Sequence, residues 1–449
     1  MKRSQPELRR TLGLTHVILY GVGLILGAGI YVIIGDVSAI AGNAIWASFI
    51  LAAFIALFTG LSYAELASMF PKSAAEYIYV KHAFGKNFIA SFVGCLTILV
   101  AITSAATVDI GFAGYFSVFF PSHSSIAYAV ILVTVLSFLN FYGIRESAWT
   151  NSVFTIVEVS GLVLIIIAGI LMGSYSETNF FELPKVASSS IDSAILAILT
   201  STALIFFAYY GFENISNLSE ETRNPTRVIP KALLISILIT SVIYVLVSIS
   251  SIALIGWKEL SSSEAPLAVA AAKAFGNYGI ILLSIIALFA TTNTVLMMLV
   301  SGSRIIFGMA RDGAISDAFS KIQRNTRTPW VATFTMMTLV IASVILSFGN
   351  IVTMASLSVF GIFVVFGFVN YSVIWLRFKQ PNLIRPFASP ISVKKFPVLA
   401  GLGLISTIIM ILQFEKNVAA SAYLIMASIF VLCVFLTMTQ KKSKHTTTS

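Results

Sequence analysis

Three acidic side chains stand out because they lie in or beside long stretches of apolar sequence. Glu158 is the most deeply placed, Glu213 directly follows a glycine-marked stretch, and Asp109 lies late in its apolar run. A carboxyl group inside a bilayer is costly, so it is a functional candidate by default. Glu158 is therefore our candidate for a proton-carrying coupling group, and its alternative role is a structural pairing within a helix bundle.

Three roles fit Glu213. It could attract a cationic ligand, carry a proton, or cap backbone donors at a break in its own helix. For Asp109, the simpler expectation is a place at the outer membrane interface.

Four glycines within nine residues interrupt the first apolar run: Gly21, Gly23, Gly27 and Gly29. Each costs a helix about 1 kcal/mol relative to alanine. One explanation is a helix deliberately broken at mid-membrane, whose freed N–H and C=O groups bind a solute. The other is close helix–helix packing through small residues.

A second break is predicted at residues 209–213 (YYGFE), in the sixth apolar run. Runs one and six are the first members of two five-span halves, and interrupted helices at matching positions of inverted halves indicate a transporter binding site. Half-helix N-termini suit a carboxylate, and their C-terminal carbonyls suit an ammonium group or a sodium ion. Such a pair of breaks matches the backbone of an α-amino acid.

Hydroxyl and amide side chains within the third and eighth apolar runs are candidate pocket or ion ligands. Their alternative role is hydrogen bonding to their own helix backbone. These residues are Thr103, Ser104 and Thr107 in the third run, and Thr291, Thr292 and Asn293 in the eighth.

Other kinds of chemistry find little support. The four histidines are scattered, no zinc-spaced Cys/His cluster occurs, and no nucleophile–base pair is evident, so we expect neither an enzyme nor a metal or cofactor site. Cys95 and Cys433 both lie in apolar runs, which argues against a structural disulfide.

The composition places these residues in a polytopic membrane protein. Of 449 residues, 58% are hydrophobic and 10% charged, against about 45–50% and about 25% in soluble domains. Continuous apolar runs, each long enough for a membrane helix, predict an all-α fold with twelve spans. The runs are 15–35, 43–69, 88–115, 125–142, 152–173, 194–216, 230–255, 276–303, 330–348, 351–376, 396–414 and 418–438.

Lysine and arginine define the orientation. With a cytoplasmic N-terminus, the outer segments hold only Lys185, Lys258, Lys273 and Lys416, and the rest of the 28 basic residues fall in inner segments. The net charge of +10 thus reflects topology, and nucleic-acid binding is not expected. Both termini are predicted to be cytoplasmic. No Walker-type motif is present, so a secondary transporter is favoured, with a channel or a transport-dead sensor as the remote alternatives.

The chain therefore divides by its spans. We expect a cytoplasmic N-terminus (1–14), a first repeat (15–173), a second repeat (194–376), two further spans (396–438) and a cytoplasmic tail (439–449).

Five segments, in order, resemble the amino acid–polyamine–organocation transporters. The first is GAGIY at 27–31, which is similar to the family pattern G-[SA]-G-I-[FY]. The others are 63–85 after the second span, FAYYGFE at 207–213, EETRNPTRVIP at 220–230 and MARDG at 309–313.

The resemblance implies a LeuT-like fold: a five-plus-five inverted repeat with two peripheral helices and alternating access around a midplane site in the cell membrane. It implies contacts to an amino acid backbone from both broken helices, with Phe207 in the place of an aromatic gate. The predicted substrate-binding set is Ile25, Gly27, Ala28, Gly29, Phe207, Ala208, Tyr209, Tyr210 and Gly211.

One departure from the family concerns coupling. Proton-coupled relatives often carry a lysine where this sequence has Glu158. A carboxylate cannot mimic a cation, but it can carry the proton itself or help to hold a real cation. We therefore expect proton coupling, with sodium coupling or exchange of amino acids or polyamines as alternatives. Aromatic residues favour a neutral substrate, whereas Glu213 facing the pocket would favour a cationic one. The oligomeric state is left open.

Overall fold

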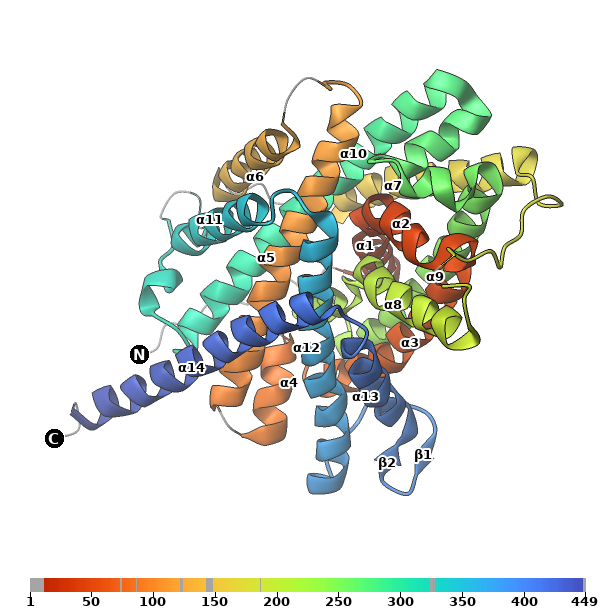
Figure 1. The fold of residues 1–449 in the computed structure, drawn as a ribbon. Helices are drawn as coiled ribbons and strands as arrows, with labels where there is room; N and C mark the ends of the chain where they lie inside the picture. The colour runs from red at the N-terminus through yellow and green to blue at the C-terminus, as the bar shows by residue number, and fades with distance from the viewer. Residues whose placement is uncertain are drawn as a thin grey trace.

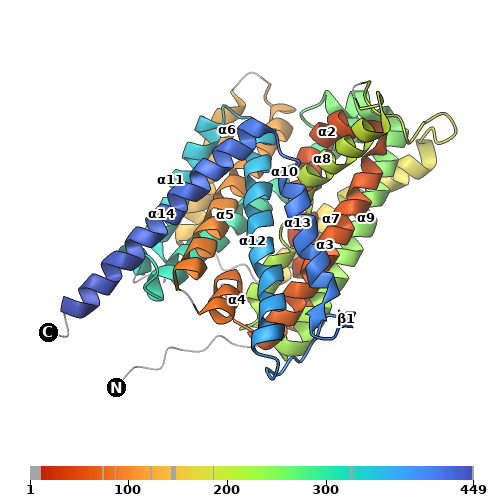
Figure 2. The ribbon, with the colours of Figure 1, turned by 60° about the horizontal axis from the view of Figure 1, so that its bottom comes forward.

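The chain folds into a bundle of long helices, with the C-terminal helix extending along and beyond one side (Figures 1 and 2). The computed structural model describes residues 12–72, 75–85, 87–121, 124–142, 148–185, 187–323, 326 and 328–446. Most of the expected N-terminal segment 1–14 and the last three residues of the tail lie outside this described part.

The first half of the chain supplies seven α-helices. They are α1 (Leu14–Leu26), α2 (Ala28–Ala41), α3 (Ile45–Met69), α4 (Ala75–Phe84), α5 (Asn87–Ser117), α6 (Ser125–Tyr142) and α7 (Ala148–Met172). A single 3-10 turn, η1 (Gly42–Ala44), joins α2 to α3.

The second half continues in the same way and adds one small hairpin. Its helices are α8 (Ile191–Tyr209), η2 (Phe212–Leu218), α9 (Pro225–Ser261), α10 (Pro266–Arg311), η3 (Asp317–Ser320), α11 (Trp330–Leu346), α12 (Ile351–Lys379), α13 (Val398–Ile411) and α14 (Lys416–Thr446). The antiparallel strands β1 (Ser392–Val393) and β2 (Phe396–Pro397) lie between α12 and α13.

The predicted apolar runs coincide with these helices. Within the described residues, eight helical segments are long and apolar enough to cross a membrane, and the segment Leu14–Met69 contains α1, α2 and α3 together. A bent pair, Val398–Ile411 with Lys416–Val431, adds a ninth, while α11 is shorter. The all-helical membrane architecture is confirmed, and the number of twelve crossings stays a prediction.

Two kinks coincide with predicted run boundaries. The backbone leaves helical geometry inside α9 at Gly256 (φ 70°, ψ 166°) and inside α10 at Gly276 (φ 57°, ψ −147°). The seventh run was predicted to end at residue 255 and the eighth to begin at residue 276. Between the two kinks, α9 continues to Ser261 and α10 begins at Pro266, with a short non-helical stretch from 262 to 265.

Small residues bring the long helices of the bundle into close contact. A Cβ atom built at Gly94 of α5 would lie 2.7 Å from Met309 Sδ of α10, and one at Gly302 of α10 would have Ala101 of α5 at 3.4 Å. These two contacts show that α5 and α10 run antiparallel, and they define the register between the two helices.

A buried ion pair fastens the end of α3 to the end of α12. Glu65 is 1% exposed and accepts hydrogen bonds from Arg377 Nε (2.9 Å) and Nη2 (2.6 Å). Arg385 Nε lies 3.4 Å from the same carboxylate, and the Ser389 backbone N–H donates to it at 2.8 Å. Glu65 therefore organises the segment between α12 and the hairpin as well.

A second, exposed ion pair joins α4 to the end of α10. Lys81 Nζ lies 2.7 Å from Asp312 Oδ2, which also accepts a hydrogen bond from the Tyr77 hydroxyl. Partial burial raises the pKa of Asp312, but the bonds from Lys81 and Tyr77 outweigh it and hold that pKa below its ordinary value. Both pairs lie at the face predicted to be cytoplasmic.

The C-terminal helix α14 packs against α5 and α12. Phe430 makes edge contacts with Phe88 and Phe92 of α5. Cys433 and Cys95 form no disulfide in the described part of the chain, and their sulfur atoms lie 3.7 Å apart. The two cysteines, which were expected not to form a disulfide, are therefore neighbours in space.

Candidate functional site

The first apolar run is broken at Gly27. Helix α1 ends at Leu26 and α2 begins at Ala28, with Gly27 at φ −18° and ψ −142° between them. The Ala28 N–H, freed by the break, donates to Thr294 Oγ1 of α10 at 3.1 Å. A Cβ at Gly27 would lie 2.6 Å from the same oxygen, so a larger residue would displace this contact.

The second break lies at Tyr210 and Gly211, between α8 and η2. Gly211 has φ +129° and ψ −25°, a conformation that L side chains rarely adopt. Its N–H donates to Glu213 Oε2 at 3.0 Å, and the Asn214 side chain donates to Oε1 at 2.9 Å. Of the three roles considered for Glu213, capping of the broken helix is the one that these contacts display.

The two breaks touch each other. A Cβ at Gly29 would lie 2.6 Å from Ala208 Cα, and one at Gly211 would lie 2.9 Å from the Leu24 carbonyl oxygen. The two explanations offered for the glycines therefore hold together: the helix is broken, and its glycines also allow backbones to approach closely.

A tyrosine of α9 contacts backbone carbonyls at the C-terminal ends of both α1 and α8. The Tyr244 hydroxyl hydrogen-bonds the Ile25 carbonyl and lies 2.8 Å from the Ala208 carbonyl oxygen. Both carbonyls lie in the last turn of a helix, where no intrahelical N–H is available to them. Tyr244 is fully buried and was not singled out from the sequence.

Exchange of Gly29 for alanine tests the contact between the breaks. The added Cβ would meet Ala208 backbone atoms, which cannot rotate away, so G29A is expected to destabilise the protein by about 1–3 kcal/mol, as other overpacked sites do. Thermal unfolding in detergent measures the effect. The matched control is G308A on α10, where a Cβ meets nothing within 4 Å. Equal melting temperatures for the two variants would contradict the close approach.

Exchange of Tyr244 for phenylalanine tests the hydroxyl bridge. The buried carbonyls of Ile25 and Ala208 would lose a donor, so we expect Y244F to cost about 1–3 kcal/mol of stability. The control is Y278F, since Tyr278 is 86% exposed. If Y244F melts as the unchanged protein does, the hydroxyl does not hold the two helix ends.

Glu158 lies on α7, fully buried beside the first break. Its Oε1 accepts a hydrogen bond from Asn293 Nδ2 of α10 at 3.3 Å, and its Oε2 has no hydrogen-bond partner among the described residues. The Tyr31 hydroxyl of α2 donates to the Glu158 backbone carbonyl at 2.8 Å. The predicted Glu158 and Asn293 are thus brought together, with one carboxyl oxygen left over.

Asp109, for which a place at the outer membrane interface was the simpler expectation, is buried within the protein. It is 0% exposed, because α5 is covered on this side by neighbouring helices, α2 among them. A Cβ at Gly111, two residues further along α5, would lie 2.3 Å from Val32 Cγ2 of α2. Position along an apolar run does not reveal which neighbouring helix covers its end, so this burial was not predicted.

Most of the predicted hydroxyl ligands bond to their own helices. Thr103 donates to the Leu99 carbonyl, Thr107 to Thr103 and Thr291 to Ala287. The Ser104 hydroxyl instead meets Ser358 of α12, and Thr292 is half-buried. The hydroxyl that reaches a break is that of Thr294, one helical turn beyond Thr291.

A small pocket opens beside the second break. Two members of the predicted substrate-binding set, Tyr210 and Gly211, line it, and its remaining lining was not predicted as a site. That remaining lining consists of Tyr20, Leu24, Ala101, Asn214, Met297, Met298 and Ser301.

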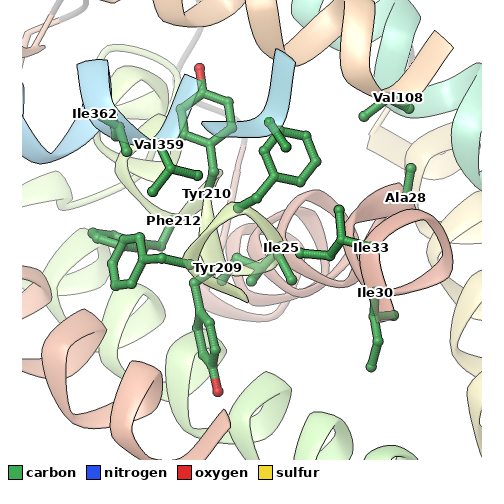
Figure 3. Close-up of a cluster of buried hydrophobic side chains, with 14 of the residues drawn as sticks. Ile25, Ala28, Ile30, Ile33, Val108, Tyr209, Tyr210, Phe212, Val359 and Ile362 are labelled. Carbon is green, nitrogen blue, oxygen red and sulfur yellow. The ribbon is translucent and has the colours of Figure 1, made fainter. Parts of the chain in front are cut away.

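The other predicted substrate residues are packed among buried side chains (Figure 3). Tyr209 and Tyr210 point in opposite directions there, and the Tyr209 hydroxyl donates to the Phe49 carbonyl of α3 at 3.1 Å. The buried ones also include Ile25, Ala28, Gly29, Phe207 and Ala208. Their role in binding stays a prediction.

Glu76 is a buried acidic residue that sequence reasoning used only as part of a motif. It lies in the first turn of α4, 3% exposed, and accepts a hydrogen bond from Tyr63 at 3.1 Å. Burial raises the pKa of its carboxyl above the ordinary value. Within the described residues, no group of three or more His, Cys, Asp or Glu side chains is arranged to hold a metal ion.

Comparisons with known proteins agree with this geometry. A family described as amino acid permease matches residues 12–439. The branched-chain amino acid permease BcaP of Bacillus subtilis is 29% identical over 431 residues, 91% of this chain and 89% of that protein. The methylthioribose transporter of the same organism is 28% identical over 407 residues, 86% and 85% of the two chains.

A solved structure has the same fold. The manganese transporter of Eremococcus coleocola superposes with a TM-score of 0.61 and 13% identity, over 97% of each chain. At that identity the likeness concerns the fold alone, which is LeuT-like, as the sequence predicted.

Proposed function

Because this chain belongs to the amino acid permease family, and is therefore a multi-pass amino acid transporter, we propose that it takes up neutral amino acids driven by a proton gradient. The observation that carries the proposal is the meeting of two broken helices beside a pocket, with a buried carboxyl next to them. We further propose that it works by alternating access in the cell membrane, with both termini in the cytoplasm.

The pocket beside Gly211 is our proposed place for the substrate's amino and carboxyl groups. Asn214 supplies an amide, and the Ser301 hydroxyl lies within 3.4 Å of its Oδ1 atom. Tyr20 and Leu24 lie on the N-terminal side of the first break, which is the cytoplasmic side in the predicted topology. This position suits a state from which substrate leaves inward.

The lining favours an uncharged, apolar substrate side chain. Leu24, Ala101, Met297 and Met298 provide apolar surface, and the nine lining residues include no charged side chain. Methionine adapts easily to different apolar shapes. Glu213 is engaged with Gly211 and Asn214, which argues against its serving as the partner of a cationic substrate. The name of the branched-chain permease is consistent with this choice.

Glu158 is our proposed coupling group. It is buried at the first break, and its unpartnered Oε2 atom can hold a proton without displacing the Asn293 bond. Proton uptake from one side and release to the other would accompany each substrate.

Uptake into proteoliposomes tests the proposal. Labelled leucine, alanine, serine and lysine are offered across an imposed acid-outside pH gradient, then with the gradient collapsed by an uncoupler. We expect saturable accumulation of the apolar amino acids that the uncoupler abolishes. Accumulation that needs a sodium gradient instead, or that occurs only into liposomes preloaded with amino acid, would replace proton coupling by the sodium or exchange alternative. Uptake that does not saturate would indicate a channel.

A further inference from the structure

Asp109 differs from every other buried carboxylate among the described residues. Its side chain is 0% exposed, and neither Oδ1 nor Oδ2 has a hydrogen-bond partner. No salt bridge reaches it in the described part of the chain. Burying an unpaired carboxylate charge costs several kcal/mol, so a residue in this position needs either a partner or a proton.

Each of the remaining buried carboxylates forms a hydrogen bond or an ion pair within the structure. Glu65 holds two arginines, and Glu213 caps the second break. Glu76 accepts from Tyr63, and Glu158 accepts from Asn293. Asp109 forms no stabilising hydrogen bond or ion pair with a described residue. An intramembrane carboxyl group without a structural partner is a candidate for function.

Asp109 lies on the outer side of the first break in the predicted topology. Its neighbour Val108 belongs to the same cluster of buried side chains as Ala28 (Figure 3). Further along α5, Gly111 packs on Val32, and the Tyr115 hydroxyl donates to the Tyr31 carbonyl at 2.8 Å. The antiparallel register of α5 and α10 places Asp109 level with Thr294, the residue that bonds Ala28.

The helices around this part of α5 offer no counter-charge. The titratable residues on the outer part of the bundle are Tyr115 on α5, Tyr31 and Asp36 on α2, Tyr128 on α6, Glu264 just before α10, Lys273 and Tyr278 on α10, and Lys416 and Tyr423 on α14, and the outer halves of α11 and α12 carry none. None of these residues forms a described hydrogen bond or ion pair with Asp109.

We propose that Asp109 is a proton-dependent latch for the outer side of the transporter. When α2 and α5 separate, water reaches the carboxyl, which loses its proton to the outer medium and becomes charged. The helices close over it again only after a proton from that medium has returned to one of the carboxyl oxygens. Closure of the outer side, and with it every turnover, then depends on external acidity.

This latch is separate from coupling through Glu158, although it rests on the proposed alternating access. The proton on Asp109 comes from and returns to the outer side, so it contributes no net proton movement. Exchange of labelled for unlabelled substrate, which needs opening and closing but no driving gradient, therefore isolates the latch.

Exchange in proteoliposomes at fixed internal pH and varied external pH is the test. We expect exchange by the unchanged protein to fall as the external medium becomes alkaline. Asp109→Asn, which is permanently neutral and of the same shape, should exchange at alkaline pH within about twofold of its rate at acidic pH. The control Asp192→Asn, at an exposed position on α8, should keep the external pH dependence of the unchanged protein.

Three results would overturn the latch. One is exchange by the unchanged protein that does not depend on external pH. This measurement does not require any variant to fold. Another is a D109N profile that matches the unchanged protein. The third is a folded D109N that exchanges at no pH, because the site would then need a negative charge, as a cation ligand does. Loss of proton-driven accumulation with a normal exchange profile in the unchanged protein would instead count against the proposed function alone.

Discussion

Replacing Glu158 with glutamine is expected to abolish accumulation driven by a pH gradient while exchange of substrate continues. Glutamine keeps the side-chain shape, and its amide oxygen can still accept the bond from Asn293, so the bundle should stay intact. Unlike the carboxyl group of Glu158, the glutamine amide cannot take up and release a proton. Proteoliposome uptake with and without an acid-outside gradient measures the loss, and exchange should stay within about twofold of the unchanged protein.

The control for this variant is Glu177→Gln, an exposed acidic residue between α7 and α8. It should accumulate substrate normally. If E158Q also accumulates substrate in response to the gradient, the coupling proton resides elsewhere. If both accumulation and exchange disappear from a protein with a normal melting temperature, Glu158 serves binding or conformational change rather than coupling.

Replacing Glu65 with glutamine should cause the largest loss of stability. The carboxylate is 1% exposed, and the side chains of Arg377 and Arg385 are only 11% and 13% exposed, so two cations would remain buried without an anion. Breaking a buried pair by removing one partner typically costs about 3–5 kcal/mol. Thermal unfolding in detergent measures this cost, with a parallel measurement of folded yield.

The chain supplies a matched comparison in its exposed ion pair. Lys81 and Asp312 are 34% and 44% exposed, and such pairs contribute at most about 1 kcal/mol. Asp312→Asn should therefore melt close to the unchanged protein. If E65Q and D312N lose equal stability, burial of the Glu65 carboxylate does not increase the contribution of its ion pairs to the stability of the protein.

Much of the architecture was predictable because each membrane helix appears in the sequence as a long run of apolar residues. The apolar runs are largely helical, and the kinks at Gly256 and Gly276 lie where the seventh run ends and the eighth begins. The break at Gly27 was predictable for a related reason: glycine is costly in a helix and is retained only where backbone geometry requires it.

The partners of the breaks were not predictable from local sequence. Thr294 bonds Ala28 across 266 positions of the chain, and Tyr244 reaches Ile25 across 219. These contacts depend on how whole helices pack, and a lone buried threonine or tyrosine gives no sign of it. Asp109 shows the same limit, since its depth in the apolar run was evident but its cover by α2 was not.

The Tyr244 bridge gives two buried carbonyls one hydrogen-bond donor between them. The phenol carries a single hydrogen and lies between the carbonyls of Ile25 and Ala208, so it cannot donate fully to both at once. The C-terminal ends of α1 and α8 therefore depend on the same hydroxyl hydrogen, and neither end can move away from Tyr244 without changing the hydrogen bonding of the other.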